Sequence, residues 1–416
     1  MKNDCSSHRI AKTEFSKNIG GFAAILIGFG LLSSVVLPSV SLGGLGLYLV
    51  TLLSPVVFLC VLFFWFKVPL IHPSSIFPLV LGVMVCISAL ASWVCGLSSV
   101  NGRDIVEAVK YIQFWPYLLL VPFIGPKSLK TFHQAVVFCS ILAAFVGFVQ
   151  VFGIGHSISY LYLGGNSSHI DHVLSGHRIT LTGSDPNVGG IIASFFGVYY
   201  FSLYSIYRRA WYFLAFMLFF YLCFLTQSRT ALIAVLFGLG FYYMFFFRGL
   251  FVLKVLLFFA SISLVIFLVF YLDLSYVYVG IQHALEGKNN SLNVRFENIY
   301  LASKIFLDSP LFGVGPAKSS FDTTIDSEYA LIIQRYGLVG VLVFSVYIVY
   351  LIRLALRNLS SHWGVCLFVF TLMSILIMVT NNIFSGYQLM SLVVLLNIAC
   401  ILSERRLHQT NEEIVF

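Results

Sequence analysis

The chain has 416 residues, of which 59% are hydrophobic and 10% are charged, and its mean hydropathy is +0.96. This composition excludes a water-soluble globular protein, because such proteins carry about 25% charged residues. The net charge of +8 does not indicate nucleic-acid binding, since the Lys and Arg residues are scattered singly or in pairs between apolar runs. Basic residues in that arrangement indicate membrane topology.

Apolar runs recur along the chain, and most approach the ~20 residues with which a helix crosses a bilayer. We therefore predict an all-α, polytopic integral membrane protein in which residues 1–416 form a single transmembrane domain. The first run is too long for the apolar core of a signal peptide, so we expect it to be retained as a helix. About twelve spans are predicted, at 19–40, 44–66, 75–97, 105–124, 131–154, 187–207, 210–226, 230–248, 251–272, 329–352, 363–382 and 386–403.

The distribution of charge predicts the orientation of these spans. When the N-terminal tail is placed in the cytoplasm, the short cytoplasmic connections hold most of the basic residues, among them Arg208, Arg209, Arg405 and Arg406. The acidic residues lie mostly on the other side. This asymmetry is typical of membrane proteins, and it predicts that both termini are cytoplasmic.

Two longer polar segments, 155–186 and 273–328, interrupt the pattern, and the alternation of spans places both on the outer side. Loops of this length usually carry a site or a lid. Within the second loop we predict an amphipathic helix near 293–307, ended by Asp308-Ser309-Pro310.

Arginines on the outer side are the first candidates for chemistry. Arg229 stands in a short polar step between two apolar runs, where an unpaired guanidinium would cost several kcal/mol, so it needs a partner. Either Arg229 reaches interfacial water or pairs with a carboxylate such as Asp185 or Asp326, or it binds a phosphate, which suits the planar donors of arginine. The other outer arginines are Arg178, Arg295 and Arg335.

Two further motifs stand at the starts of predicted helices. Asp185-Pro186-Asn187 is typical of a helix N-terminus, which caps the helix and also favours an anion. Asp326 is placed to cap the span that starts near 329, and Asp326 or Glu328 could instead take a proton from a sugar hydroxyl or pair with an arginine. Gly337 and Gly340 indicate close helix packing.

The remaining polar residues give weaker signals. Glu107 and Lys110 lie one helical turn apart and predict an ion pair inside the bundle. The histidines His156, His169, His172 and His177 match no zinc spacing, so no metal site is predicted. The chain has no phosphate-binding loop and no dinucleotide fingerprint, so neither ATP nor a nicotinamide cofactor is expected.

Taken in order, several short motifs resemble the O-antigen ligase and polymerase superfamily of bacterial envelope glycosyltransferases. The motifs are Arg178 with Gly183 and Pro186-Asn187, then Gln227-Ser228-Arg229-Thr230-Ala231, then Arg295 before Ser309-Pro310 and Gly313-Val314-Gly315, and finally Tyr329 with Gly337 and Gly340. The ligases usually open the last motif with a His-Asn pair, where this chain has Asp326-Ser327. That departure favours the Wzy-type polymerase over the ligase.

The resemblance implies a GT-C-like membrane glycosyltransferase of the bacterial inner membrane, with its active site facing the periplasm. It would transfer a growing glycan from undecaprenyl diphosphate to an incoming lipid-linked repeat unit, inverting the anomeric centre without metal or other cofactor. In that reading Arg229, Arg295, Asp326 and Glu328 are catalytic, and Arg178, Asn187, Tyr329 and Arg335 bind substrate.

The implied partners are the two lipid-linked oligosaccharides, membrane lipid and, as an option, a chain-length regulator. Two alternatives remain open from the sequence. One is an O-antigen ligase that attaches the polymer to lipid A-core. The other is a lipid-linked oligosaccharide flippase or transporter, although the charges gather in the outer loops and not near the membrane midplane.

Overall fold

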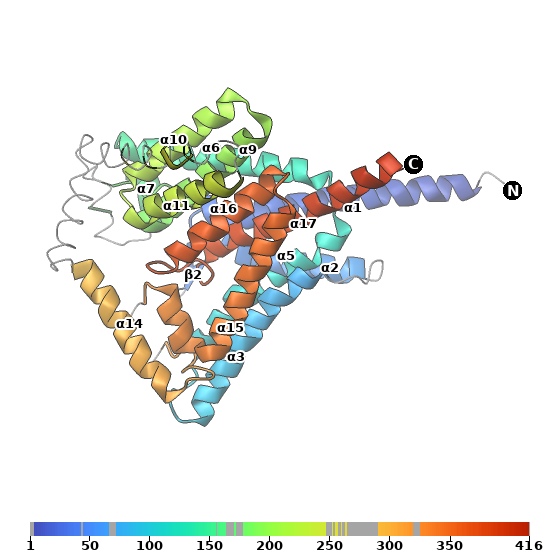
Figure 1. Cartoon of the computed structure of the whole chain (residues 1–416). Helices are drawn as coiled ribbons and strands as arrows, with labels where there is room; N and C mark the ends of the chain where they lie inside the picture. The colour runs from blue at the N-terminus through green and yellow to red at the C-terminus, as the bar shows by residue number, and fades with distance from the viewer. Residues whose placement is uncertain are drawn as a thin grey trace.

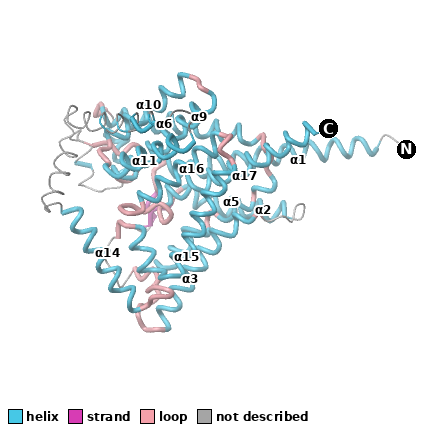
Figure 2. Tube along the Cα trace, viewed as in Figure 1, coloured by secondary structure: helices cyan, strands magenta, loops and turns pink. Residues whose placement is uncertain are grey.

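The computed structural model describes residues 4–42, 45–65, 72–154, 156–163, 170–171, 178–246, 290–318 and 325–415, with a few isolated residues between 252 and 263. Regular structure in these ranges is almost entirely helical (Figure 2). The elements are α1 (Asp4–Val36), β1 (Val40–Leu42), β2 (Leu45–Leu47), α2 (Leu49–Trp65), η1 (Pro73–Ser75), α3 (Ile76–Val94), α4 (Gly102–Ile112), α5 (Trp115–Leu119), η2 (Val121–Phe123), α6 (Ser128–Val151), α7 (His156–Leu163), α9 (Pro186–Tyr207), α10 (Ala210–Leu225), α11 (Arg229–Phe246), α14 (Asn290–Asp308), α15 (Glu328–Arg357), α16 (His362–Ile377) and α17 (Tyr387–Val415).

The helices confirm a polytopic, all-α membrane protein. Within the described residues, six segments are long and apolar enough to cross a bilayer: Pro73–Val94, Ser128–Val151, Pro186–Tyr207, Arg229–Phe246, Glu328–Arg357 and Tyr387–Leu407. Shorter apolar helices at Gly20–Val36, Leu49–Phe63, Ala210–Leu225 and His362–Ile377 occupy further predicted spans. The span predicted at 251–272 lies largely outside the described residues.

The span predicted at 105–124 is wrong as a single crossing helix. The chain there forms α4, α5 and the short η2, and none of these is long enough to cross a bilayer. Pro116 and Pro122 each stand near the start of a new element, because proline lacks the N–H that would continue the preceding helix. The helix α4 is strongly amphipathic, and the apolar residues of one face were wrongly assigned to the beginning of a membrane span.

The two predicted outer loops contain helices of their own. The helix α7 lies within 155–186, and α14 covers the segment where an amphipathic helix was predicted and ends at Asp308. The hairpin of β1 and β2 pairs Val40 with Leu47 in antiparallel register and joins α1 to α2.

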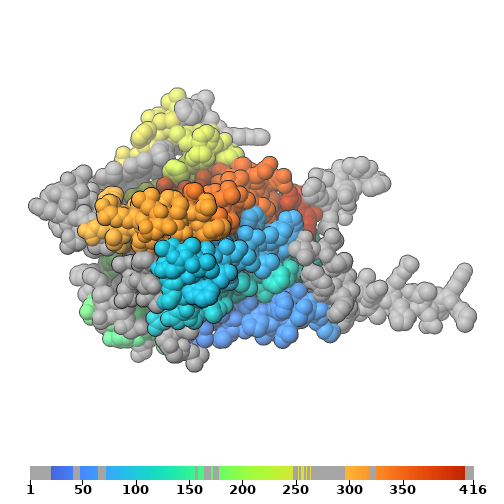
Figure 3. Space-filling model, turned by 90° about the horizontal axis from the view of Figure 1, so that it is seen from below, coloured from blue at the N-terminus to red at the C-terminus, as the bar shows by residue number. Residues whose placement is uncertain are grey.

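The core of the bundle is formed by α9, α16 and α17. In the most apolar stretch of α17 and of α9, 89% and 78% of residues are buried, against 33% in α11 and α15. Helices that are buried on all sides are apolar all round, as these are. In Figure 1, α17 runs through the middle of the molecule, and its last turns lie at the same end as the first turns of α1. On the face shown in Figure 3, α14 and α15 lie beside the α3 region.

Candidate active site

The helix α15 is broken at Gly337, and this break shapes the site. Gly337 has φ +58° and ψ −153°, a conformation that residues with a Cβ rarely adopt. The chain around Pro310–Gly315 fills the break: Leu338 N–H donates to the carbonyl of Pro310 at 2.9 Å, and Gly315 N–H donates to that of Arg335 at 2.9 Å. Gly337 therefore serves as a kink, in addition to the packing role predicted from the sequence.

The two segments that meet at the break are too close together for a side chain on Gly313 or on Gly337. A Cβ on Gly313 would lie 2.4 Å from the carbonyl carbon of Arg335, and a Cβ on Gly337 would lie 2.7 Å from the Gly313 nitrogen. The Ser88 hydroxyl on α3 lies within hydrogen-bond distance of the carbonyls of Phe312 and Arg335. The motif at 313–315 and the motif at 337–340 are thus one structural unit, and that unit fixes Arg335.

Arg335 belongs to a buried charge cluster built on Glu107, which we name the Glu107 cluster (Glu107, Lys110, Lys318 and Arg335). Glu107 is fully buried, and its carboxylate lies 3.2 Å from Arg335 Nη1, 3.0 Å from Lys110 Nζ and 2.7 Å from Lys318 Nζ. Burial alone would raise the pKa of Glu107, but the three cations together lower it to about 2. The cluster carries three positive charges against one negative charge.

The position of Lys318 depends on α4 as well. Its backbone N–H donates to Asp104 Oδ1 at 3.1 Å, while the other oxygen of Asp104 accepts the backbone N–H of Asn101 at 2.9 Å and completes the capping box of α4. One short helix therefore holds both the backbone and the side chain of Lys318. This explains how residues in three separate parts of the sequence converge.

The Glu107 cluster forms part of the wall of a cavity of about 440 Å³. The rest of the lining supplies carboxylates, amides and aromatic rings, which are groups that suit sugar hydroxyls and sugar faces. The tyrosines Tyr48 and Tyr387 have ring centroids 5.3 Å apart, and Lys110 Nζ lies 5.5 Å from the centre of the Tyr387 ring. The polar lining beyond the cluster comprises Tyr48, Ser184, Asp185, Asp326, Asn381, Asn382, Ser385, Tyr387 and Gln388.

The predicted cap at Asp185 is confirmed, and it faces this cavity. Asp185 Oδ1 accepts the backbone N–H groups of Asn187 at 2.8 Å and Val188 at 3.0 Å at the start of α9. The predicted cap at Asp326 is wrong: Ser327 is the N-cap of α15, its hydroxyl accepting from the Ala330 N–H. Asp326 is left exposed in the cavity wall.

Arg178 and Arg229 lie near one another at the start of α11, and neither lines the cavity. Arg178 Nε donates to the carbonyl of Thr226 at 3.0 Å, and Arg229 begins α11 three residues further on. Asn187 also contacts this segment, because its side-chain oxygen accepts from the Ser228 hydroxyl at 3.2 Å. Three residues from two of the predicted motifs, Arg178 and Asn187 from one and Arg229 from the other, are therefore brought together.

A buried glutamine holds the loop that carries Arg178. Gln150 Oε1 accepts the backbone N–H groups of Thr180 at 3.0 Å and Leu181 at 2.9 Å, and its Nε2 donates to the Leu181 carbonyl at 2.9 Å. Leu181 has a positive φ of 49°, which the glutamine contacts stabilise. Gln150 lies inside an apolar run, and nothing in the sequence indicated this role.

A hydrogen bond connects this arginine pair to the cavity. The Thr380 hydroxyl donates to that of Thr230, next to Arg229, at 2.9 Å. The following residues, Asn381 and Asn382, line the cavity, and Asn382 Nδ2 donates to the Ile325 carbonyl at 3.2 Å. The Glu107 cluster thus lines the cavity, whereas the arginine pair does not and is linked to its wall through Thr230, Thr380 and Asn381.

Glu328 and Tyr329 do not line the cavity. Glu328 is fully buried, and its two oxygens accept the backbone N–H groups of Ile383 and Ser385 at 2.7 Å and of Phe384 at 3.0 Å. It fixes the loop that carries the lining residue Ser385. The Tyr329 hydroxyl donates to the Ile375 carbonyl at 2.8 Å. Arg295 lies in α14, and its side chain is outside the described part of the chain.

An apolar groove of about 240 Å³ begins beside the cavity. Its wall is made by α3 and α15, with Val83, Met84 and Ser88 on one side and Tyr336 and Val339 on the other. Arg335 lines the charged cavity and the next residue, Tyr336, lines the groove. An amphiphile could therefore place its polar part in one space and its chain in the other.

Sequence patterns missed several of these residues. The ion pair of Glu107 and Lys110 is confirmed at 3.0 Å, but its extension to Lys318 and Arg335 had no local signal. Within the described residues, no group of three or more His, Cys, Asp or Glu side chains could hold a metal ion. His169, His172 and His177 lie outside those residues.

Fold and site together define a multi-pass helical membrane protein with a charged cavity beside an apolar groove. Residues 213–345 match the family model described as O-antigen ligase, which confirms the resemblance to the O-antigen ligase and polymerase superfamily. The match covers α10, α11, α14 and the first half of α15, and it contains Arg229, Arg295, Asp326 and Arg335 but not Arg178. A comparison with curated proteins gave no match.

Proposed function

We propose that the protein is a polymerase of O-antigen, or of a related surface polysaccharide, that joins repeat units carried on undecaprenyl diphosphate. The observation that carries this proposal is that Arg335 lines the charged cavity while the next residue, Tyr336, lines the apolar groove. A lipid-linked glycan has a polyprenyl chain, a diphosphate and sugars. The apolar groove suits the polyprenyl chain, the cations suit the diphosphate, and the polar lining suits the sugars.

The presence of two cationic groups supports the binding of two lipid-linked substrates. A polymerase binds a donor and an acceptor at once, and each carries a diphosphate. We assign one diphosphate to Arg229, Arg295 and Arg178, and the other to Lys318 and Arg335 of the Glu107 cluster. Arginine suits this task because it stays charged and offers two parallel donors.

The chemistry requires little beyond charge stabilisation. A diphosphate is a good leaving group once its charge is stabilised, so cations replace the general acid of a glycosidase. The acceptor hydroxyl attacks the anomeric carbon, the bond from that carbon to the diphosphate oxygen breaks, and the anomeric centre inverts. Asp326 is our candidate to take the hydroxyl proton, because it is an exposed carboxylate in the cavity wall. No metal is required.

Glu328 receives a positioning role in this scheme, and so does Asp185. The Asp185 carboxylate accepts backbone N–H groups at the start of α9, and the Glu328 carboxylate accepts those of the 383–385 loop. The loops that they hold carry lining residues of the cavity.

We place the protein in the bacterial inner membrane with this cavity on the periplasmic side. Support comes from the opposite end of the same helices, where Arg208 ends α9 and Arg357 ends α15. Basic residues of that kind favour the cytoplasm. A chain-length regulator is compatible with this arrangement.

The test uses purified protein in detergent with lipid-linked repeat units from a strain that lacks the gene. We expect a ladder of longer lipid-linked glycans, without lipid A-core or added metal. A flippase gives no ladder in detergent, where translocation has no meaning. No ladder at any protein concentration contradicts the polymerase.

The description of the matched family favours one second candidate, an O-antigen ligase. Cells that lack a ligase still make long chains but leave them unattached to lipid A-core. Cells that lack a polymerase make no long chains and attach single repeat units. Glycans from a deletion strain therefore distinguish the two functions.

A further inference from the structure

A second cavity, of about 450 Å³, lies at the other end of the bundle. The helices α9 and α17 connect the two ends: Val188 and Leu389 line the charged cavity, whereas Tyr207 and Leu407 line this one. At 1.5 Å per residue, these positions on each helix are roughly 28 Å apart, close to the thickness of the bilayer hydrocarbon. The second cavity is therefore at the opposite membrane surface from the candidate active site.

The electrostatic environment of this cavity favours an anion. Lys130 and Arg406 line it from α6 and α17, and both side chains are exposed. The helix α16 begins in its wall: Ser361 is the N-cap and accepts the Gly364 N–H at 3.1 Å, so the positive end of the helix dipole points to the cavity. No carboxylate lines the cavity among the residues that the structure describes.

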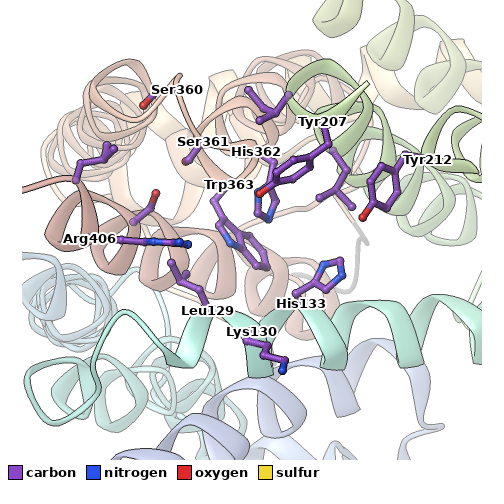
Figure 4. Close-up of a pocket in the computed structure, with 14 residues that line it drawn as sticks. Leu129, Lys130, His133, Tyr207, Tyr212, Ser360, Ser361, His362, Trp363 and Arg406 are labelled. Atoms are coloured by element: carbon purple, nitrogen blue, oxygen red, sulfur yellow. The ribbon is translucent and has the colours of Figure 1, made fainter. Parts of the chain in front are cut away.

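Uncharged donors and aromatic rings complete the polar wall. Figure 4 shows Tyr207, Tyr212 and His133 near His362, with Trp363 beside His362 on the side toward Arg406. Trp363 is 1% exposed, and its Nε1 has no hydrogen-bond partner in the described part of the chain, nor has Nε2 of His362. Buried polar atoms are normally paired, so these two atoms mark a site where a ligand or solvent group completes the hydrogen bonding.

The rest of the lining is apolar and comes from the ends of membrane helices. Leu129, Leu203, Ile206 and Leu407 lie beside the polar groups. A soluble anion would leave these side chains uncovered. The phosphate of a phospholipid would meet the cations, while its glycerol and first acyl carbons would cover the leucines.

We propose that this cavity binds the headgroup phosphate of an anionic membrane phospholipid. Lys130 and Arg406 would neutralise the phosphate, and the start of α16 would orient it. The site is separate from the proposed transfer reaction, and it would anchor α6, α9, α16 and α17 at one membrane surface. The proposal does not depend on which glycan the protein handles.

Native mass spectrometry of the full chain in neutral detergent, with phosphatidylglycerol added stepwise, tests this. The variant Lys130→Gln/Arg406→Gln removes two charges from the cavity. The matched control Lys127→Gln/Arg353→Gln removes the same charges from exposed positions at the same end, outside the lining. We expect the first variant to bind phosphatidylglycerol at least about tenfold more weakly, and the control to bind within about twofold of the wild type.

Two further ligands test whether both the charge and the acyl chains of the lipid are needed for binding. Phosphatidylcholine, which has no net charge, should bind weakly to wild-type protein. Free sn-glycerol 3-phosphate should not displace phosphatidylglycerol at equal concentration, because it lacks the acyl carbons. Equal phosphatidylglycerol binding by both double variants, or equal displacement by the free phosphate, overturns the proposal. If the double variant is unstable without lipid, Arg406→Gln alone gives the same comparison.

Discussion

Arg335 Nη1 lies 3.2 Å from Oε1 of Glu107, although the two residues are 228 positions apart in the chain. The contact joins the kinked helix α15 to the short helix α4, and it does so at a carboxylate that is fully buried. An ion pair in that setting is costly to break from one side, because the remaining charge stays buried without its partner.

The Glu107 cluster should make stability depend on acid pH. The pKa of Glu107 in the folded protein is about 2, below its ordinary value of 4.5. The charged cluster therefore stabilises the fold fully above about pH 4.5, and this stabilisation is lost as the pH falls toward 2. The difference corresponds to about 3 kcal/mol at most. Melting temperature measured against pH should therefore fall below pH 4.5 in the wild type.

The matched variant for this effect is Glu107→Gln, which keeps the shape of the side chain and removes its charge. We expect a lower melting temperature at pH 7 and a weaker dependence on pH between 4.5 and 2. A variant as stable as the wild type at neutral pH would show that the cluster does not stabilise the fold.

Gly337→Ala should destabilise the protein. The positive φ of 58° disfavours alanine, and its Cβ would lie 2.7 Å from the Gly313 nitrogen and from Leu311. A strained backbone position of this kind costs about 1–3 kcal/mol before any clash is counted. The control is Gly21→Ala in α1, where a Cβ would meet nothing within 4 Å. Thermal unfolding should separate the two, and identical melting temperatures would contradict the kink.

Arg229→Ala and Arg295→Ala should abolish polymer formation without preventing membrane insertion. Replacement by lysine should restore little activity, because lysine lacks the planar pair of donors. Arg209→Ala, at an exposed position on the other end of the bundle, should leave glycan ladders unchanged. Ladders of wild-type length from both alanine variants would remove the arginines from the mechanism.

Substitutions at Asp326 and Glu328 should have different effects, because we assign a chemical role to Asp326 and a positioning role to Glu328. Asp326→Asn removes the proposed base and should reduce the turnover rate by about 10²–10⁴ without changing the melting temperature. Glu328→Gln weakens three hydrogen bonds from backbone N–H groups and should lower the melting temperature by an amount equivalent to about 1–3 kcal/mol. The reverse pattern would exchange the two assignments.

Removal of divalent metal should leave the transfer reaction unchanged. The energy for transfer is stored in the bond from sugar to diphosphate, and the proposed mechanism uses cationic side chains only. The measurement is the glycan ladder with and without EDTA. Inhibition that is reversed by one divalent ion would instead make the histidines His169, His172 and His177 metal-site candidates.

Local patterns in the sequence determined the class of protein and some of its helix boundaries. Apolar runs of bilayer length predicted most of the membrane helices, and Asp185-Pro186-Asn187 predicted the start of α9, because both depend on neighbouring residues only. The same reasoning failed at 105–124, where α4 buries its charged face against other elements. A one-dimensional pattern cannot show which face of a helix finds a partner.

Only the tertiary structure decided which charged residues share a site. It joined Glu107 to Lys318 and Arg335, committed Glu328 to the backbone of 383–385, and placed a second cavity around His362 and Trp363. These contacts join residues far apart in the chain, and their free energies depend on burial and on distances of about 3 Å. Neither burial nor the distance between two side chains produces a periodic pattern in the sequence. These contacts can therefore be recognised only in the packed structure.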